Sequence, residues 1–74
     1  MIRIRLTQML DDKGFKEKRK ITLKEVAKEA CLSQPTLSRI SNIPGYNTNT
    51  DTINALCKYF KCKPGDILEF YPDE

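Results

Sequence analysis

Histidine, cysteine and paired carboxylates are the side chains that most often do chemistry, and this sequence offers little of that kind. Histidine is absent, which removes an imidazole base, a Ser-His or Cys-His pair and any histidine-containing metal site. The cysteines Cys31, Cys57 and Cys62 are odd in number and lack the paired C-x-x-C spacing of a zinc site. Free cysteine is usually a small buried apolar residue, so we expect no metal site and no disulfide framework.

Adjacent carboxylates occur at Asp11-Asp12 and at Asp73-Glu74. Acid–base catalysis needs a positioned partner group, and both pairs lie in polar, helix-end or terminal contexts without one. The sequence therefore predicts a protein that is not an enzyme and that uses no cofactor and no small-molecule ligand.

Positive charge is concentrated in one part of the chain, although the net charge is only +3. Between residues 13 and 20, five lysine and arginine residues face a single acid, Glu17. Residues 66–74 carry four acidic residues and no cation. One part of the surface can therefore approach a polyanion while another part should avoid it, although a lysine run can also be a plain solvated loop.

Length and composition point to one small globular domain spanning residues 1–74. A chain of 74 residues buries only about 60% of the surface that its unfolded state exposes, which leaves no room for a second core. The composition, 39% apolar and 31% charged, is too apolar for a disordered chain and too interrupted by charge for a membrane span. The N-terminus lacks the apolar region of a secretory signal, so we expect a cytoplasmic protein without membrane contact.

Hydrophobic spacing predicts a mainly helical domain of four to five helices between two short terminal strands. Residues Ile2 to Leu6 alternate apolar and polar side chains, as a half-buried strand does. The spacing then changes to that of a helix, which Gly14 is expected to end. Near the C-terminus, Glu69 to Tyr71 reads as extended chain that could pair antiparallel with the first strand.

Two central helices carry clear start signals. Thr22 and Glu25 have the spacing of a capping box, and Ser33 followed by Pro35 marks the start of a third helix that ends near Asn42. Only about three residues separate these two helices, which predicts a tight helical corner.

A fourth helix and a last helical turn follow the polar loop Tyr46 to Thr50. Asn49 or Thr50 can cap the fourth helix. Its apolar stripe consists of Ile53, Leu56, Cys57 and Phe60. Pro64 then stands at a first-turn position of a short turn that should bury Ile67 and Leu68.

Residues 22–42 have the apolar spacing of a helix-turn-helix motif. Apolar side chains occur where two such helices pack, and a small residue, Ala27, stands where they cross. The apolar positions are Leu23, Val26, Ala30, Leu32, Leu37 and Ile40. This crossing places the second helix on the outside of the domain, where its polar face can enter a major groove about 12 Å wide.

These residues carry a family resemblance. The segment Ile21 to Asn42 resembles the DNA-binding motif of bacterial and phage repressors, and locally the headpiece of the lac repressor family. Residues 51–60 and the ending Cys62-Lys63-Pro64-Gly65-Asp66-Ile67-Leu68 resemble the small Cro/C1-type (XRE-like) regulators. The fourth helix and the Pro-Gly-Asp turn have no counterpart in the lac-type headpiece, which favours the Cro/C1 type and implies a lambda-repressor-like fold.

The sequence departs from the family pattern at two places. Cys31 stands at the turn position that glycine usually occupies, where a left-handed backbone would strain a residue with a side chain. The connection from Gly14 to Ile21 is also longer and more basic than the usual turn.

The resemblance implies which residues meet DNA. In such repressors the exposed positions early in the recognition helix face base edges, which here are Ser33, Gln34, Pro35, Thr36, Ser38 and Arg39. Phosphate contacts are implied for Thr22 and Lys24 at the start of the second helix, and for Asn42, Tyr46, Asn47 and Thr48 in the following loop. The cluster Lys16 to Lys20 could approach the backbone less specifically.

The resemblance implies a sequence-specific DNA-binding regulator, and a repressor in particular, of bacterial or phage origin. One small module reads too little DNA alone, so we expect a homodimer on a palindromic operator of double-stranded DNA. Its seam is expected at the terminal strands, with Ile2, Ile4, Phe70 and Tyr71, although Phe70 and Tyr71 could equally close the domain's own core. The alternative is a protein-interaction module, such as an antitoxin-like or phage adaptor domain, on the same fold.

Overall fold

The computed structural model of the chain describes residues 1–72. In this part of the chain, two short strands enclose five helices in sequence. The elements are β1 (Ile2–Ile4), α1 (Leu6–Glu17), α2 (Leu23–Ala30), α3 (Gln34–Asn42), α4 (Thr50–Phe60), α5 (Pro64–Ile67) and β2 (Leu68–Phe70). The predicted mainly helical fold with paired terminal strands is confirmed. Asp73 and Glu74, the second adjacent acidic pair, lie outside the described residues.

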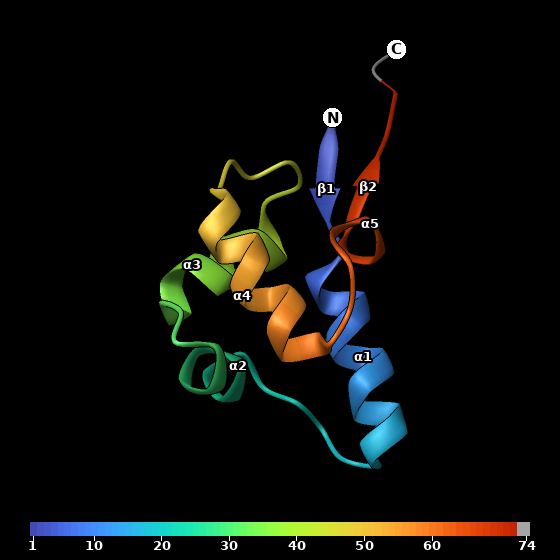
Figure 1. The fold of residues 1–74 in the computed structure, drawn as a ribbon, viewed down its shortest axis with the longest axis vertical. Coiled ribbons are helices and arrows are strands. Elements are labelled where there is room, and N and C mark those ends of the chain that lie inside the picture. Colours follow the sequence, from blue (N-terminus) through green and yellow to red (C-terminus); the bar gives the residue numbers. More distant parts are fainter. Residues whose placement is uncertain (73–74) are drawn as a thin grey trace.

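The two strands form a small antiparallel sheet at the end of the molecule where the N-terminus emerges (Figure 1). Ile2 is paired with Phe70, Arg3 with Glu69, and Ile4 with Leu68. The backbone of Met1 and Tyr71 extends this pairing with hydrogen bonds of 2.7 and 2.8 Å. The first strand ends earlier than predicted, at Ile4, because Leu6 already belongs to α1 and to the core.

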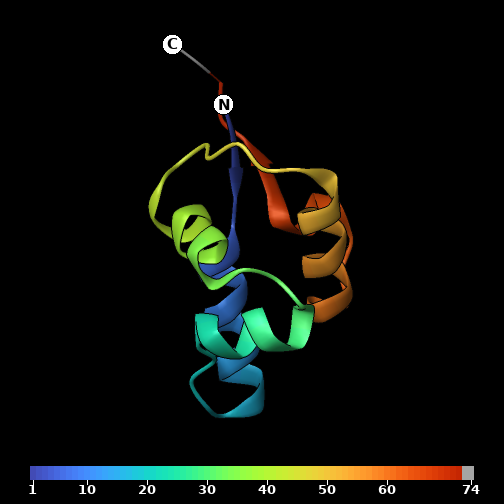
Figure 2. The same ribbon diagram turned by 90° about the vertical axis from the view of Figure 1, so that its left-hand side faces the viewer.

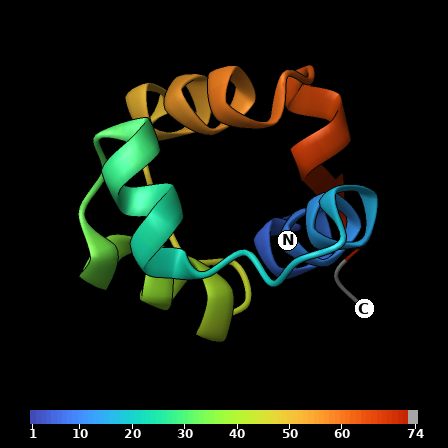
Figure 3. The ribbon, with the colours of Figure 1, turned by 90° about the horizontal axis from the view of Figure 1, so that it is seen from below.

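The hydrophobic core draws residues from all five helices and the linker before α2. Its buried members are Leu6, Ile21, Val26, Leu37, Ile40, Leu56 and Ile67. The helices surround this core, with α4 on one side and α1 and α3 on the other (Figure 3). Each such side chain contributes roughly 1.5 to 3 kcal/mol by leaving water, so a few residues per helix hold the fold. Among the described residues no helix is long and apolar enough to cross a bilayer.

Helix α1 passes through Gly14 instead of ending there, which corrects the prediction. It runs to Glu17, and Lys18 then takes the left-handed conformation at φ 57°. Gly14 is needed for a different reason: an added Cβ would lie 2.6 Å from the backbone oxygen of Arg19. The backbone N–H of Arg19 donates to the Gly14 oxygen at 3.0 Å, so the glycine lets the chain return closely against its own helix.

Only one of the two hydrogen bonds of the predicted α2 capping box is present. The Thr22 hydroxyl accepts a hydrogen bond from the Glu25 backbone N–H at 3.2 Å, as expected. The Glu25 carboxylate, however, binds the Arg19 guanidinium at 2.7 and 2.8 Å. A charged partner six residues earlier has therefore replaced the reciprocal bond to the helix start.

The remaining helix starts follow the sequence signals with small differences. Asn49, not Thr50, caps α4, and its side-chain oxygen accepts from the Thr52 N–H at 2.9 Å. Ser33 is the N-cap residue of α3, but within residues 1–72 its hydroxyl makes no capping hydrogen bond. The Asp66 carboxylate accepts from the Lys63 N–H at 3.0 Å and so closes the first turn of α5. That turn buries Ile67, while Leu68 is only half-buried.

Candidate nucleic-acid interface

The corner between α2 and α3 turns at Cys31. Its backbone is left-handed, at φ 57° and ψ 45°, as the sequence predicted for this position. The next N–H, that of Leu32, donates to the Ala27 oxygen at 2.9 Å and closes the end of α2. A residue with a Cβ in this conformation costs about 1 kcal/mol, so the corner is held by the packing of the helices on either side.

One face of α3 is locked into the core. Leu37 is 0% exposed and Ile40 is 4% exposed, and both pack in the same cluster as Val26 of α2. Because these apolar positions fix the rotation of α3 about its own axis, the opposite face of the helix must point outward. The tertiary structure thus turns the polar face of α3 to the outside of the domain.

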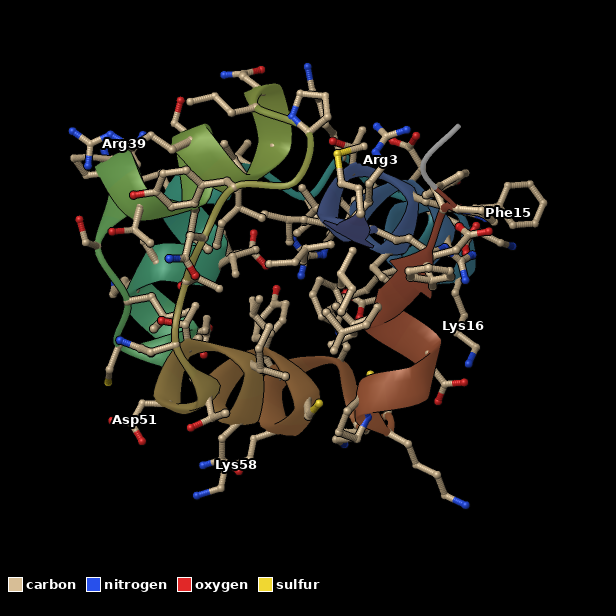
Figure 4. The ribbon with its side chains drawn as sticks, turned by 90° about the horizontal axis from the view of Figure 1, so that it is seen from above. Arg3, Phe15, Lys16, Arg39, Asp51 and Lys58 are labelled. Atoms are coloured by element: carbon tan, nitrogen blue, oxygen red, sulfur yellow. The ribbon has the colours of Figure 1, made fainter. Side chains whose placement is uncertain are left out.

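The six candidate base-reading residues lie at the start of α3 and on its outward side. Ser33, Gln34, Pro35 and Arg39 are exposed, while Thr36 and Ser38 are half-buried. Arg39 points away from the body of the molecule (Figure 4) and has no ion pair within residues 1–72. The Asn42 amide donates to the Ser38 hydroxyl at 3.3 Å, which places Asn42 one turn further along the same side.

The candidate phosphate residues at the start of α2 stand on the helix N-terminus. Lys24 is exposed and has no ion pair in the described part of the chain. The Thr22 oxygen accepts the capping bond from Glu25, so its hydroxyl hydrogen is still available to donate. The N-terminal end of a helix attracts an anion, so both residues are suited to a phosphate.

The loop between α3 and α4 brings further polar groups beside α3. In Figure 2 this loop arches across the molecule from α3 to α4. A small polar hollow of about 310 Å³ lies beneath it, lined by Thr36, Tyr46, Asn47, Thr48, Asn49 and Thr52. Three loop candidates therefore share one hollow with Thr36 of α3 and the start of α4. Sequence reasoning missed Asn49 and Thr52 as members of this hollow, although the capping signal at Asn49 already located the helix start.

Part of the basic segment is neutralised within the domain. Arg19 binds Glu25 and also Glu17 at 2.9 Å, and Lys13 binds Glu17 at 2.7 Å. The hydrogen bond from Arg19 lowers the pKa of the Glu25 carboxyl and Glu25 in turn raises the pKa of Arg19. Arg19 and Lys13 are thus engaged by acids of the same domain.

The lysines at positions 16, 18 and 20 are exposed and without an ion pair in the part of the chain that the structure describes. Lys16 lies on the opposite side of the molecule from Arg39 (Figure 4). The structure therefore does not gather the whole basic segment beside α3.

The candidate seam residues lie in the terminal sheet. Ile2 is 57% exposed, Phe70 is 67% exposed and Tyr71 is 39% exposed, whereas Ile4 is half-buried and packs against the core. Phe70 and Tyr71 therefore do not close the domain's own core. Their exposure leaves an apolar surface at this end of the molecule.

The cysteines are free thiols. Cys31 is exposed, and Cys57 and Cys62 are half-buried against the core. Burial raises the pKa of the Cys62 thiol, and the neighbouring Cys57 adds to this effect. Within residues 1–72, no three histidine, cysteine or acidic side chains are grouped so that they could hold a metal ion.

Two comparisons with known proteins agree with this geometry. The family model of the Cro/C1-type HTH DNA-binding domain matches residues 5–73. The uncharacterized HTH-type transcriptional regulator YozG of Bacillus subtilis (strain 168) is 35% identical over 57 residues, which are 77% of this chain and 68% of that protein. The family match extends over the α2–α3 corner and every helix around it.

Proposed function

Since the chain belongs to the Cro/C1-type HTH DNA-binding domain family, we propose that it is a sequence-specific transcriptional regulator that reads double-stranded DNA with α3. The observation that carries this proposal is the orientation of α3. Leu37 and Ile40 are buried while Gln34 and Arg39 are exposed, so the polar face is the one offered to a major groove. Bound to an operator, such a domain represses by excluding polymerase.

Each candidate base-reading residue has a chemically suitable base partner. Arg39 can donate two hydrogen bonds to O6 and N7 of guanine, and Gln34 can pair bidentately with adenine. The Thr36 methyl group and the Pro35 ring suit the methyl group of thymine, and Ser33 and Ser38 suit either donors or acceptors. These residues carry the proposed sequence preference.

Two phosphate contacts would then flank α3. Thr22 and Lys24 offer one at the start of α2, and the hollow formed by Tyr46, Asn47 and Thr48 offers the other. The Asn42 amide binds the Ser38 hydroxyl at the end of α3, from which the chain continues into this loop. Contacts on both sides of the helix would fix its register on the duplex without reading sequence.

A homodimer would complete the reading unit. A single module of this size buries only about 600 to 1,000 Å² of protein surface on DNA, which gives limited specificity. The exposed apolar side chains of Ile2, Phe70 and Tyr71 support a seam at the terminal sheet. A twofold dimer would match a palindromic operator.

Selection of bound sequences from a random duplex pool tests this function. We expect a palindromic consensus whose half-sites repeat at about one helical turn, 10 to 10.5 base pairs, or a multiple of it. The same selection with Arg39→Ala should lose the preference at one base pair per half-site. A wild-type pool that stays random after selection at physiological salt would contradict sequence-specific reading.

A further inference from the structure

Helices α1, α2 and α4 end in the same backbone arrangement, but α4 carries different side chains there. In each case the residue after the helix is left-handed, and the following N–H donates to a backbone oxygen five residues earlier. The donor and acceptor residues are Arg19 and Gly14 at 3.0 Å, Leu32 and Ala27 at 2.9 Å, and Cys62 and Cys57 at 3.0 Å. Of these three helix ends, that of α4 has a cysteine on both sides of the hydrogen bond.

This cap holds Cys57 and Cys62 close together. Ordinary bond lengths around an N···O contact of 3.0 Å leave the two Cα atoms at most about 7 Å apart, which is the upper limit for a disulfide. In caps of this type the side chains at these two positions commonly touch each other. The Cys57 thiol also affects its neighbour: burial raises the pKa of the Cys62 thiol, and Cys57 adds to the effect through charge and hydrogen bonding.

The turn that joins the two cysteines is held by the backbone. Lys61 between them is left-handed, at φ 55° and ψ 52°, and its N–H donates to the same Cys57 oxygen as the N–H of Cys62. Both cysteine side chains are half-buried and pack against the core. The fold itself therefore keeps the two free thiols near each other, so the second thiol is present wherever the first one reacts.

We propose that Cys57 and Cys62 are a reversible redox pair whose disulfide locks the end of α4. The oxidant is a peroxide. One thiolate sulfur attacks a peroxide oxygen and becomes a sulfenic acid, while the O–O bond breaks and the other oxygen leaves as hydroxide, which takes up the thiol proton. The second sulfur then attacks the sulfenic sulfur, and its proton leaves with the hydroxyl group as water.

For hydrogen peroxide the reaction is balanced, because two thiols and one peroxide give one disulfide and two molecules of water. The sulfur atoms together lose the two electrons that the peroxide gains. A dithiol reverses the step by thiol–disulfide exchange. Cys31 takes no part, because at the end of its own helix the paired positions are occupied by Ala27 and Leu32.

The lock would act on the segment that follows α4. Cys62 leads directly into α5 and β2, and the latter pairs with β1 in the terminal sheet. The oxygen of Ile67 in α5 also accepts from the Arg5 N–H at 2.7 Å. A cross-link at Cys62 therefore ties this C-terminal segment to α4. The proposal does not depend on DNA binding.

Peptide mapping tests the pairing directly, because each cysteine lies on a different tryptic peptide. Trypsin separates Cys31, Cys57 and Cys62 into the peptides 29–39, 40–58 and 62–74. The folded chain is treated with hydrogen peroxide, its remaining thiols are alkylated, and the digest is analysed by mass spectrometry. We expect peptides 40–58 and 62–74 to be joined and to separate with dithiothreitol, while peptide 29–39 is alkylated. Cys31→Ser should give the same joined peptides.

Urea denaturation tests whether the disulfide is a lock. The midpoint of the oxidised protein should lie on the order of 1 M above that of the reduced protein, because the cross-link restricts the unfolded chain. Cys62→Ser is the matched control, since serine is close to cysteine in size but forms no disulfide. Its midpoint should be the same with and without peroxide.

Three results would overturn the proposal. The first is joined peptides that form only after the chain has been unfolded, or a disulfide that includes peptide 29–39 instead. The second is an oxidised protein that unfolds at a lower urea concentration than the reduced one, since the bridge would then strain the cap. The third is a peroxide-dependent midpoint in Cys62→Ser that equals the shift of the wild type.

Discussion

Ile2 and Phe70 lie directly opposite each other in the terminal sheet, and both side chains are more than half exposed. Opposite residues of an antiparallel pair share one face of the sheet. The next pair on that face, Ile4 and Leu68, is half-buried. An apolar face therefore starts on the core and continues to Ile2 and Phe70, which the described residues 1–72 leave exposed.

We expect this pair to form the seam of the proposed homodimer. The double substitution Ile2→Ser with Phe70→Ser should shift the protein toward monomer in analytical ultracentrifugation, because it removes the apolar area at the seam. Affinity for a palindromic site should fall to that for a half-site. Phe15→Ala is the control, since it removes a phenylalanine that is even more exposed than Phe70 and lies outside the sheet, and it should leave the mass unchanged. A monomeric wild type at high micromolar concentration would reject the seam.

Arg39 and Lys24 should differ in how they affect DNA binding. Arg39→Ala should cost roughly 1 to 3 kcal/mol on the preferred sequence and relax the preference at one base pair. Lys24→Ala should weaken all sequences alike and lower the slope of log affinity against log salt by about one. Fluorescence anisotropy with specific and random duplexes over a salt series measures both effects.

Lys58→Ala serves as the control for lost positive charge. Lys58 projects from α4 on the side of the molecule away from α3 (Figure 4). Its removal should change the salt slope by much less than that of Lys24. Equal losses on specific and random DNA for Arg39→Ala would take Arg39 out of the base-reading set.

Gly14→Ala should destabilise the domain although alanine favours helices. The added Cβ would lie 2.6 Å from the Arg19 backbone oxygen, so the linker must move. Such overpacking costs about 1 to 3 kcal/mol of unfolding free energy. Gly65→Ala is the control, because a Cβ there meets nothing within 4 Å. Urea denaturation of both variants measures the difference, and similar stabilities would contradict the close approach.

Cys31→Gly should stabilise the corner. Glycine takes the left-handed conformation at φ 57° without the Cβ penalty of about 1 kcal/mol. Cys31→Ala keeps a Cβ and should bring no such gain. We therefore expect the glycine variant to unfold at higher urea concentration than the alanine variant, and the reverse order would argue against a left-handed residue at this position.

The Arg19–Glu25 pair should contribute to stability at neutral pH and lose its effect in acid. Arg19 lowers the pKa of the Glu25 carboxyl below its ordinary value of 4.5. A group with a lowered pKa in the folded state stabilises the fold above its unfolded pKa, and this contribution is lost as the pH falls through the folded value. The temperature at which the wild type unfolds should therefore fall as the pH drops below about 4.5.

Glu25→Gln should reduce the loss of thermal stability at acidic pH, since glutamine does not titrate. Glu29→Gln is the control on the same helix, because Glu29 is exposed and has no ion pair in the described part of the chain. If the unfolding temperature falls as steeply with decreasing pH in Glu25→Gln as in the wild type, the pair does not control this pH dependence.

The sequence by itself determined the features that depend on spacing along the chain. Helical periodicity at Leu37 and Ile40 was enough to predict which face of α3 is buried, because a helix places residues three and four apart on one side. The left-handed turn at Cys31 was implied by the family resemblance, because Cys31 stands at the turn position that glycine usually occupies. The candidate residues on the outward face of α3 follow from the same periodicity.

Only the tertiary structure decided the features that depend on residues distant in sequence or on competition between partners. Gly14 reads locally as a helix end, but the close return of Arg19 makes it a packing position inside α1. Glu25 reads as a capping residue, yet a guanidinium offers it a stronger, charge-assisted partner. Local patterns cannot settle such cases, because the energies that decide them come from contacts that exist only after the helices have packed.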